Sequence, residues 1–324
     1  MGTSFLRLAF VGQRTFFEAC ALGGERRDMR TAFFEFRKGG DADHLLSELQ
    51  AFRPDVVVVF RPEIIPAGCF ASLRGATLGW LTEPIPRGTT SEHSDQRRRL
   101  WELQQVDPSN FDRVVSFDPL IASTASGVLD VWRSIPLPVA DRYFMPVRPI
   151  RGRPRALFVG RSTPHREYFL TPVKHQYDVL HMAFGVDAAE LERLLAEHEV
   201  GINLHNEPYP SFENRVPIHL AAGHLVISEP LSPLHGLEPG VDFLELGWPG
   251  LLANTLETLA RFPGAYERVR VRGRMKAELF RASRVYPRLI SDLLTDLAAK
   301  NGGRTPFFHT GSPISTSVPF GSRT

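Results

Sequence analysis

Polar side chains gather where a strand-like run meets a helix in the stretch PSFENRVPIHLAAGHLVISEP, residues 210–230. The preceding run VGINLH, residues 200–205, reads as a buried strand. Pro217 is tolerated only in the first turn of a helix, so we expect a helix that begins at 214–216, with Ser211 as its cap. An arginine near a helix start is unfavourable against the helix dipole unless it binds a carboxylate or a phosphate. The stretch therefore predicts an anion site built from His205, Glu213, Asn214 and Arg215.

A second loop with phosphate-binding chemistry lies in FVGRSTPHREYF, residues 158–169. Guanidinium groups donate two hydrogen bonds to a phosphate and stay charged, so Arg161 and Arg166 are candidate ligands, with Gly160 at the end of the strand. The loop lacks the pattern GxxxxGK[ST], which excludes a P-loop kinase or ATPase.

In the first half of the chain, loops after strand-like runs supply polar residues for a second substrate. Gly12, Gln13 and Arg14 follow the first run. Residues 60–66 contribute Arg61 and Glu63, and residues 81–93 contribute Glu83, Arg87 and His93. Removal of a proton from a hydroxyl group needs a carboxylate or an imidazole within hydrogen-bond reach. Glu83, Glu63 and His93 all qualify as that base, and their spacing does not choose among them.

Composition limits the class of protein. The chain has 324 residues, 43% of them hydrophobic, which suits two domains, and its net charge of +2 gives no reason to expect a nucleic-acid partner. Cys20 and Cys69 show no spacing for zinc or for a disulfide framework, and no apolar run is long enough to span a membrane, so we expect a cytoplasmic protein. The basic run QRRRL, residues 96–100, is interpreted as a solvated helix face, with weak contact to an anionic membrane as the alternative.

Apolar runs that alternate with amphipathic segments predict an α/β protein with parallel sheets covered on both faces. The first domain is predicted at 1–145, a Pro- and Arg-rich linker at 146–154, the second domain at 155–300 and a disordered tail at 301–324. The last helical region, 266–300, is expected to break near Pro287. The sequence DAD at 41–43 does not lie at a strand end, so no carboxylate pair of DxD type predicts a metal site.

The order Ser211, Phe212, Ala221, Gly223 and Pro230, with the later segment 233–246, resembles the C-terminal (group 1) domain of GT-B glycosyltransferases. Within that family the chain is similar to the CgeB-like branch, in which an arginine corresponding to Arg215 opens the helix. The resemblance implies a GT-B fold, in which two Rossmann-like domains face a cleft. It also implies transfer of a sugar from a nucleotide-diphosphate sugar to an unidentified acceptor, without a metal or another cofactor. The second domain would hold the donor and the first the acceptor.

The same resemblance places His235 in a loop that covers the donor sugar. Where the retaining branch of the family has two glutamates, this chain has Pro210 and Ile218, and the nearest carboxylate is Glu213. Two other functions stay open: an inactive GT-B protein that binds nucleotide sugars or serves as a scaffold, and a nucleotide-sugar epimerase of similar architecture. A dinucleotide oxidoreductase is disfavoured because neither glycine loop has the pattern GxGxxG.

Overall fold

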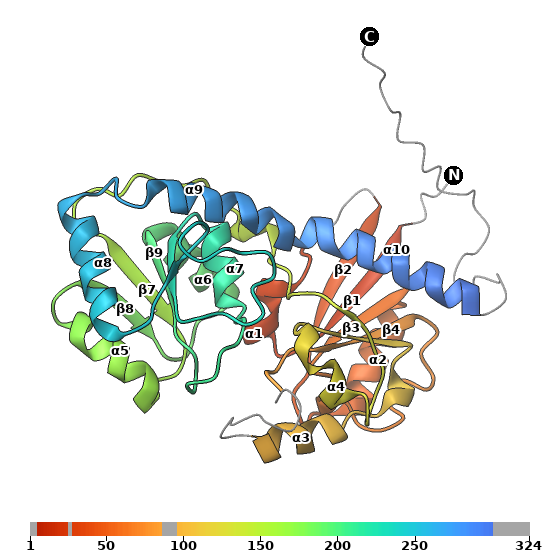
Figure 1. Cartoon of the computed structure of the whole chain (residues 1–324). Coiled ribbons are helices and arrows are strands. Elements are labelled where there is room, and N and C mark those ends of the chain that lie inside the picture. The colour runs from red at the N-terminus through yellow and green to blue at the C-terminus, as the bar shows by residue number, and fades with distance from the viewer. Residues whose placement is uncertain (1–4, 25–27, 86–95, 301–324) are drawn as a thin grey trace, which may run out of the picture.

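The computed structural model describes residues 5–24, 28–85 and 96–300, which form two α/β domains (Figure 1). The predicted tail at 301–324 and the candidate base His93 lie outside the described residues. The first sheet is fully parallel, in the order β2-β1-β3-β4-β5-β6. Its strands are β1 (Leu6–Gly12), β2 (Met29–Glu35), β3 (Val56–Phe60), β4 (Ala76–Leu81), β5 (Arg113–Ser116) and β6 (Val131–Ser134).

The second sheet is also parallel, in the order β11-β10-β9-β7-β8. Its strands are β7 (Arg155–Val159), β8 (Asp178–Met182), β9 (Val200–Asn203), β10 (Leu225–Ser228) and β11 (Leu244–Glu245). The α/β class predicted from the sequence is therefore confirmed. The two edge strands of the first sheet, β2 and β6, were not predicted, because their partly exposed side chains break the apolar run that marks a buried strand.

Helices flank both sheets. In the first domain they are α1 (Arg14–Phe17), α2 (Ala42–Phe52), α3 (Gln96–Gln104) and α4 (Ala122–Ala125). In the second half of the chain they are α5 (Pro164–Lys174), α6 (Ala188–Glu197), α7 (Arg215–Ala221), α8 (Pro249–Arg261), α9 (Glu267–Lys276) and α10 (Ala282–Lys300). The short 3₁₀ segments are η1 (Glu18–Cys20), η2 (Pro62–Ile64), η3 (Pro108–Asn110), η4 (Pro119–Ile121), η5 (Asp141–Tyr143) and η6 (Ala277–Phe280). Within the described part of the chain, no helix combines the length and the apolar character needed to cross a membrane.

Burial on both faces explains why the central strands are apolar throughout. In β3, Val56, Val58 and Phe60 pack into one core cluster, whereas Val57 and Val59 pack into the cluster on the opposite face. Successive side chains of a strand point to opposite faces, so a sheet sandwiched between two helical layers requires an apolar residue at every position.

The last helix packs on the first domain, although it follows the second in sequence. Tyr286 and Leu293 of α10 are fully buried in the same core cluster as Phe10 and Trp80 of the first sheet. The Tyr286 hydroxyl donates a hydrogen bond to the backbone oxygen of Cys20 at 2.7 Å. In Figure 1, α9 and α10 follow one another along one side of the molecule, with α10 beside the strands of the first sheet. The sequence-based boundaries placed residues 282–300 with the second domain, and the packing of α10 corrects that assignment.

The expected helix break near Pro287 is also wrong. Pro287 lies inside α10, and the helix is interrupted instead at η6 and Arg281. There the backbone leaves the helix to pair with the segment between β6 and η5: Val139 donates to Phe280 O at 2.7 Å, and Ala282 donates to Val139 O at 2.8 Å. Two backbone hydrogen bonds to a distant segment therefore set the break, whereas the proline is accommodated.

Candidate functional site

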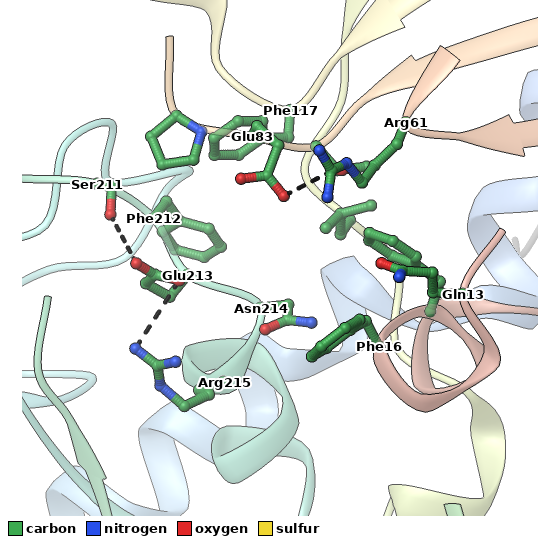
Figure 2. A pocket seen from close by; sticks show the side chains of 14 residues that line it. Gln13, Phe16, Arg61, Glu83, Phe117, Ser211, Phe212, Glu213, Asn214 and Arg215 are labelled. Carbon is green, nitrogen blue, oxygen red and sulfur yellow. Dashed lines mark hydrogen bonds and ion pairs between the residues drawn. The ribbon is translucent and has the colours of Figure 1, made fainter. Parts of the chain in front are cut away.

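A cavity of about 270 Å³ lies between the two domains. One wall comes from the segments that follow β1, β3, β4, β5 and β6, and the other comes from the segment that leads into α7 (Figure 2). Ligands of open α/β sheets bind at the carboxyl ends of the strands, which is where these loops lie. The lining residues are Gln13, Phe16, Phe17, Arg61, Thr82, Glu83, Pro84, Phe117, Leu137, Ser211, Phe212, Glu213, Asn214 and Arg215.

The helix begins within the predicted range of 214–216, but Ser211 is not its cap. Helix α7 begins at Arg215, with Asn214 at the N-cap position, and no side chain caps it. Ser211 instead donates its hydroxyl to Glu213 Oε1 at 3.1 Å, and its oxygen lies 3.3 Å from His205 Nδ1. Ser211 thus orients the Glu213 carboxylate beside the cavity and does not cap the helix.

Two guanidinium groups converge behind this wall. Arg166 Nε and Arg215 Nη2 both donate to the backbone oxygen of Leu204, at 3.2 and 2.9 Å. Both guanidinium groups also lie over the ring of Phe158, at 5.2 and 5.4 Å from its centroid. The two positive charges are therefore held close together by a shared carbonyl and a shared aromatic face.

The electrostatics of this arginine pair favour an anion. Burial, and then the charge of Arg215, lowers the pKa of Arg166. Burial raises the pKa of Glu213, but the positive charges of Arg215 and Arg166 and the hydrogen bond from Ser211 outweigh it, so its pKa lies below the ordinary value. The Glu213 carboxylate lies 3.8 Å from Arg215, and the buried Nε of Arg215 has no partner among the described residues. One carboxylate thus faces two guanidinium groups, and a donor is left for a bound anion.

Gly160 lies in close contact with the arginine pair. A Cβ atom at position 160 would lie 3.2 Å from Arg166 Nη1 and 3.4 Å from Arg215 Nη1. Gly12 takes the corresponding place after the first strand of the other sheet, with a φ of 156° against 157° for Gly160. At Gly12 the added Cβ would instead meet carbon atoms of Phe60 and Phe17.

This pair of glycines supplies a matched test. We expect Gly160→Ala to weaken binding of a nucleoside diphosphate by tenfold or more, on the order of one lost charge-assisted hydrogen bond. Gly12→Ala places an alanine at nearly the same φ but touches no cation, so it should leave the affinity unchanged. Isothermal titration with UDP measures both, and equal losses in the two variants would contradict a specific role for position 160.

Arg161 lies at the outer edge of the arginine pair. Its side chain is exposed and donates through Nε to Asn206 Oδ1 at 2.9 Å, while its backbone oxygen accepts from Arg166 Nη1 at 3.0 Å. The structure therefore brings Arg166, Gly160 and Arg215 into contact distance of one another and places Arg161 at their solvent side.

His205 supports the wall from behind. Its backbone N–H donates to Glu229 Oε2 at 2.6 Å, and its ring Nε2 lies 2.9 Å from the Pro230 carbonyl. A carbonyl only accepts, so Nε2 of His205 carries the proton. The single hydroxyl proton of Ser211 goes to Glu213, so Nδ1 of His205 lies near the Ser211 oxygen without accepting from it. Burial lowers the pKa of His205, which keeps this tautomer neutral. His205 is thus held by the segment Glu229–Pro230 and lies beside Ser211.

His235 lies beside Phe212 and is not among the residues that line the cavity. The two rings meet edge to face with centroids 4.6 Å apart, and His235 forms a hydrogen bond with the backbone of Phe117 in the other domain. Asn214 also reaches across, since its Nδ2 lies 3.9 Å from Cys20 Sγ. Both residues therefore bridge the two domains at the rim of the site.

On the first-domain wall, Glu83 is the candidate base that lines the cavity. It forms ion pairs with Arg99 and, at 3.8 Å, with Arg61. Glu63 is not among the lining residues; Arg61 Nε donates to its Oε1 at 2.8 Å, and burial raises the pKa of Glu63 despite that partner. Of the two candidate carboxylates, the structure thus exposes Glu83 to a bound substrate.

Gln13 lines the cavity, whereas the side chain of Arg14 turns away from it. The Arg14 guanidinium donates to Phe33 O at 2.7 Å and to Glu18 Oε1 at 3.2 Å. The expectation that Arg14 contacts substrate is thus not supported by its position. Residues 13–15 differ in direction because α1 begins at Arg14, and neighbouring positions on a helix point to different sides.

Sequence reasoning missed several apolar lining residues and did not commit to Arg61. Phe117 follows β5 at the same edge of the sheet as Glu83, so its place after a predicted strand was an available signal. Arg61 has a φ of 65°, rare for a residue with a side chain, and this turn at the end of β3 brings it to the cavity wall. Leu137 lies between β6 and η5, and no local pattern marks it.

A buried histidine pair links helix α7 to helix α6. His224 Nε2 lies 2.9 Å from Leu195 O, and its Nδ1 lies 3.0 Å from Nδ1 of His219. The carbonyl requires a proton on His224 Nε2, so in the neutral pair His219 Nδ1 donates to His224 Nδ1. Burial lowers the pKa of His224 to about 3 and that of His219 well below its usual range. Both rings are therefore neutral in the folded protein.

Acid should destabilise the fold through this pair. The folded-state pKa values lie below the unfolded value, so the stabilisation is present above about pH 6.5 and is lost as the pH falls toward 3. Each histidine contributes a slope of about 1.4 kcal/mol per pH unit in that window. We expect the free energy of unfolding in urea to fall between pH 7 and pH 5, above the titration of ordinary carboxyl groups. The exposed His44 serves as the control, since His44→Gln should not change this profile; a flat profile in the native chain would contradict the assignment.

Among the described residues, no group of three or more His, Cys, Asp or Glu side chains is arranged to hold a metal ion. The basic run at 96–100 is partly neutralised within the fold, because Arg98 pairs with Glu102 and Arg99 pairs with both Glu83 and Glu102.

No protein-family model and no curated protein sequence matches the chain. Solved structures do. HepE of Anabaena, in complex with UDP and glucose, has a TM-score of 0.56 and 11% identity, covering 89% of this chain and 99% of that chain. Sucrose-phosphate synthase of Thermosynechococcus elongatus has a TM-score of 0.58 and 13% identity, covering 91% and 100%. AviGT4, a glycosyltransferase involved in avilamycin A biosynthesis, has a TM-score of 0.57 and 13% identity, covering 91% and 98%. At these identities the likeness concerns the fold, and the chain has the GT-B architecture of two Rossmann-like domains with a cavity between them.

Proposed function

We propose that the protein transfers a sugar from a nucleotide-diphosphate sugar to a hydroxyl acceptor in the cavity between its domains. The observation that supports this most directly is the convergence of Arg166 and Arg215 against Gly160. A diphosphate would neutralise the two adjacent positive charges, and the planar guanidinium group matches the geometry of a phosphate. HepE, a structural neighbour, was solved with UDP and with UDP-glucose, so uridine nucleotides are the first candidates.

In this proposal one wall of the cavity binds the donor and the other binds the acceptor. On the second-domain wall, Arg166 and Arg215 bind the diphosphate, and Arg161 contacts it from the solvent side. Glu213 accepts hydrogen bonds from ribose or sugar hydroxyls. On the first-domain wall, Gln13 and Glu83 face the acceptor. The leaving diphosphate gains negative charge as the glycosidic bond breaks, and preorganised guanidinium groups stabilise that charge. The scheme therefore needs neither a metal ion nor a cofactor beyond the donor.

The proposal is tested by calorimetry of the purified protein with UDP, GDP, dTDP, CDP and ADP and with UDP-glucose. We expect one base to bind most tightly, and the matching sugar nucleotide to bind as well. Turnover is then followed as release of the nucleoside diphosphate in the presence of sugar and phenolic alcohols. Absence of binding by any of these nucleotides would overturn the proposal.

A binding protein without turnover is the second candidate, and one observation favours it. Ile218, which stands where the resemblance expects a glutamate, is buried in the core of the second domain and is 5% exposed. Position 218 therefore cannot hold the donor, and Glu213 would have to replace it. Tight nucleotide-sugar binding with no transfer or hydrolysis would favour this candidate. The CgeB-like subgroup stays a prediction from the resemblance at Arg215.

A further inference from the structure

Positive charge is concentrated on the segment that joins the two domains on their outer side. Residues 267–288 contain eight Lys or Arg residues and two Glu residues, a net charge of +6 in a chain whose total is +2. Arg270 is buried, whereas Arg268, Arg272, Arg284 and Arg288 are exposed. Figure 1 shows α9 and α10 running along one side of the molecule over both domains. We name this surface the basic face.

An apolar stripe runs along the basic face. Val271, Met275 and Leu279 are 41%, 64% and 58% exposed. Their spacing of four residues places them one above another on the same side of α9 and η6. Two of the three have a basic residue directly after them, since Arg272 follows Val271 and Lys276 follows Met275. Apolar side chains flanked by cations on a partly exposed helix are typical of a helix that lies in a membrane interface.

The stripe ends at a basic hollow of about 260 Å³. Leu279 lines it together with Arg133, Arg284 and Arg288. Its two carboxylates are already paired: Glu278 accepts from Arg274 and Arg281, and Asp292 pairs with Arg133. Arg284 also pairs with Glu278, at 3.3 Å, but its side chain is 60% exposed, so part of the guanidinium group faces solvent beside the apolar stripe.

We propose that the basic face docks on an anionic lipid surface, with Met275 and Leu279 entering the headgroup region and the exposed arginines binding lipid phosphates. The surface lies outside the cavity, so this inference goes beyond the proposed function and does not depend on it. It also moves the membrane contact considered at residues 96–100 to a different face, since Arg98 and Arg99 are paired within the chain.

The same observations disfavour other occupants. A second copy of the chain docked through this face would bring like charges together. Single-stranded nucleic acid is held by exposed aromatic rings together with cations, and the aromatic residues of this segment, Phe280 and Tyr286, are buried. An anionic bilayer is matched by both the apolar stripe and the charge.

The test is flotation of the full chain with phosphatidylcholine vesicles, with and without 30% phosphatidylglycerol, in low and high salt. We expect binding only to the anionic vesicles, weakened by salt because exposed charges are screened. Arg284→Gln with Arg288→Gln should lower the partition coefficient by roughly 30-fold, and Met275→Gln with Leu279→Gln by about tenfold or more. The control, Arg37→Gln with Arg193→Gln, removes the same charge from other exposed surfaces.

The thermal melt of each variant tests whether the variant is folded. Its affinity for nucleotides tests the cavity independently of vesicle binding. Loss of flotation in both face variants but not in the control supports the proposal. Absence of flotation with anionic vesicles overturns it, as does flotation that all variants retain equally. Binding of an oligonucleotide or an acidic protein through the same arginines, without flotation, also overturns it, and leaves the proposed function untouched.

Discussion

Replacing Arg215 by alanine is expected to raise the dissociation constant for UDP by roughly 10- to 100-fold, since a hydrogen bond to a charged group contributes about 1.5–3 kcal/mol. Arg215 is anchored by one hydrogen bond to Leu204 O, and its Nε is left for a ligand. Removing it also takes away the charge that holds down the pKa of Glu213, so the pocket loses a cation and its carboxylate becomes easier to protonate. Titration calorimetry at pH 7 measures the change directly.

Arg215→Lys separates the geometry of the guanidinium group from its charge, and Arg193→Ala serves as a surface control. Arg215→Lys keeps the positive charge but loses the planar fork, and we expect an affinity between those of the native protein and Arg215→Ala. Arg193→Ala removes an arginine that pairs with Glu190 and Glu197 on the exposed surface of α6, and should not change UDP binding. If Arg215→Ala binds UDP as tightly as the native chain, the diphosphate lies elsewhere and the assignment of the donor wall fails.

The second large effect is expected at Glu83. In an inverting transfer the acceptor hydroxyl gives its proton to a base, and among the candidate carboxylates Glu83 is the one that lines the cavity. Glu83→Gln should reduce turnover by about 10²- to 10⁴-fold, which is the usual contribution of a general base. The affinity for UDP should stay within about twofold, because Glu83 lies on the wall opposite Arg215 (Figure 2).

Glu102 supplies the matched control for this experiment. It shares the partner Arg99 with Glu83 but does not line the cavity. Release of UDP from UDP-glucose, with water and a panel of alcohols as acceptors, compares Glu83→Gln with Glu102→Gln. A similar loss in both would mean that the effect passes through the placement of Arg99, and full activity of Glu83→Gln would exclude it as the base.

Local sequence determined the central strands and the start of the helix at the site. The runs at 55–60 and 76–81 predicted β3 and β4 because a strand buried on both faces must be apolar at every position. Pro217 limited where α7 could begin, since a proline fits only the first turn of a helix unless the structure compensates. These features depend on residues within a few positions of one another, so they can be read without a fold.

Tertiary structure decided the features that join distant residues. The meeting of Arg166 and Arg215 at Leu204 O brings three separate elements together, and the pairing of Glu83 with Arg99 spans 16 residues. The backbone hydrogen bonds of Val139 set the break before α10. Tyr286 is buried in the core of the first domain and donates a hydrogen bond to Cys20 O, 266 positions earlier. A chain carries its periodicity and its proline constraints locally, whereas hydrogen bonds and ion pairs between distant segments exist only once the sheets have formed. For this reason the central strands and the start of α7 could be predicted, while the orientation of Arg14, the course of α10 and the basic face could not.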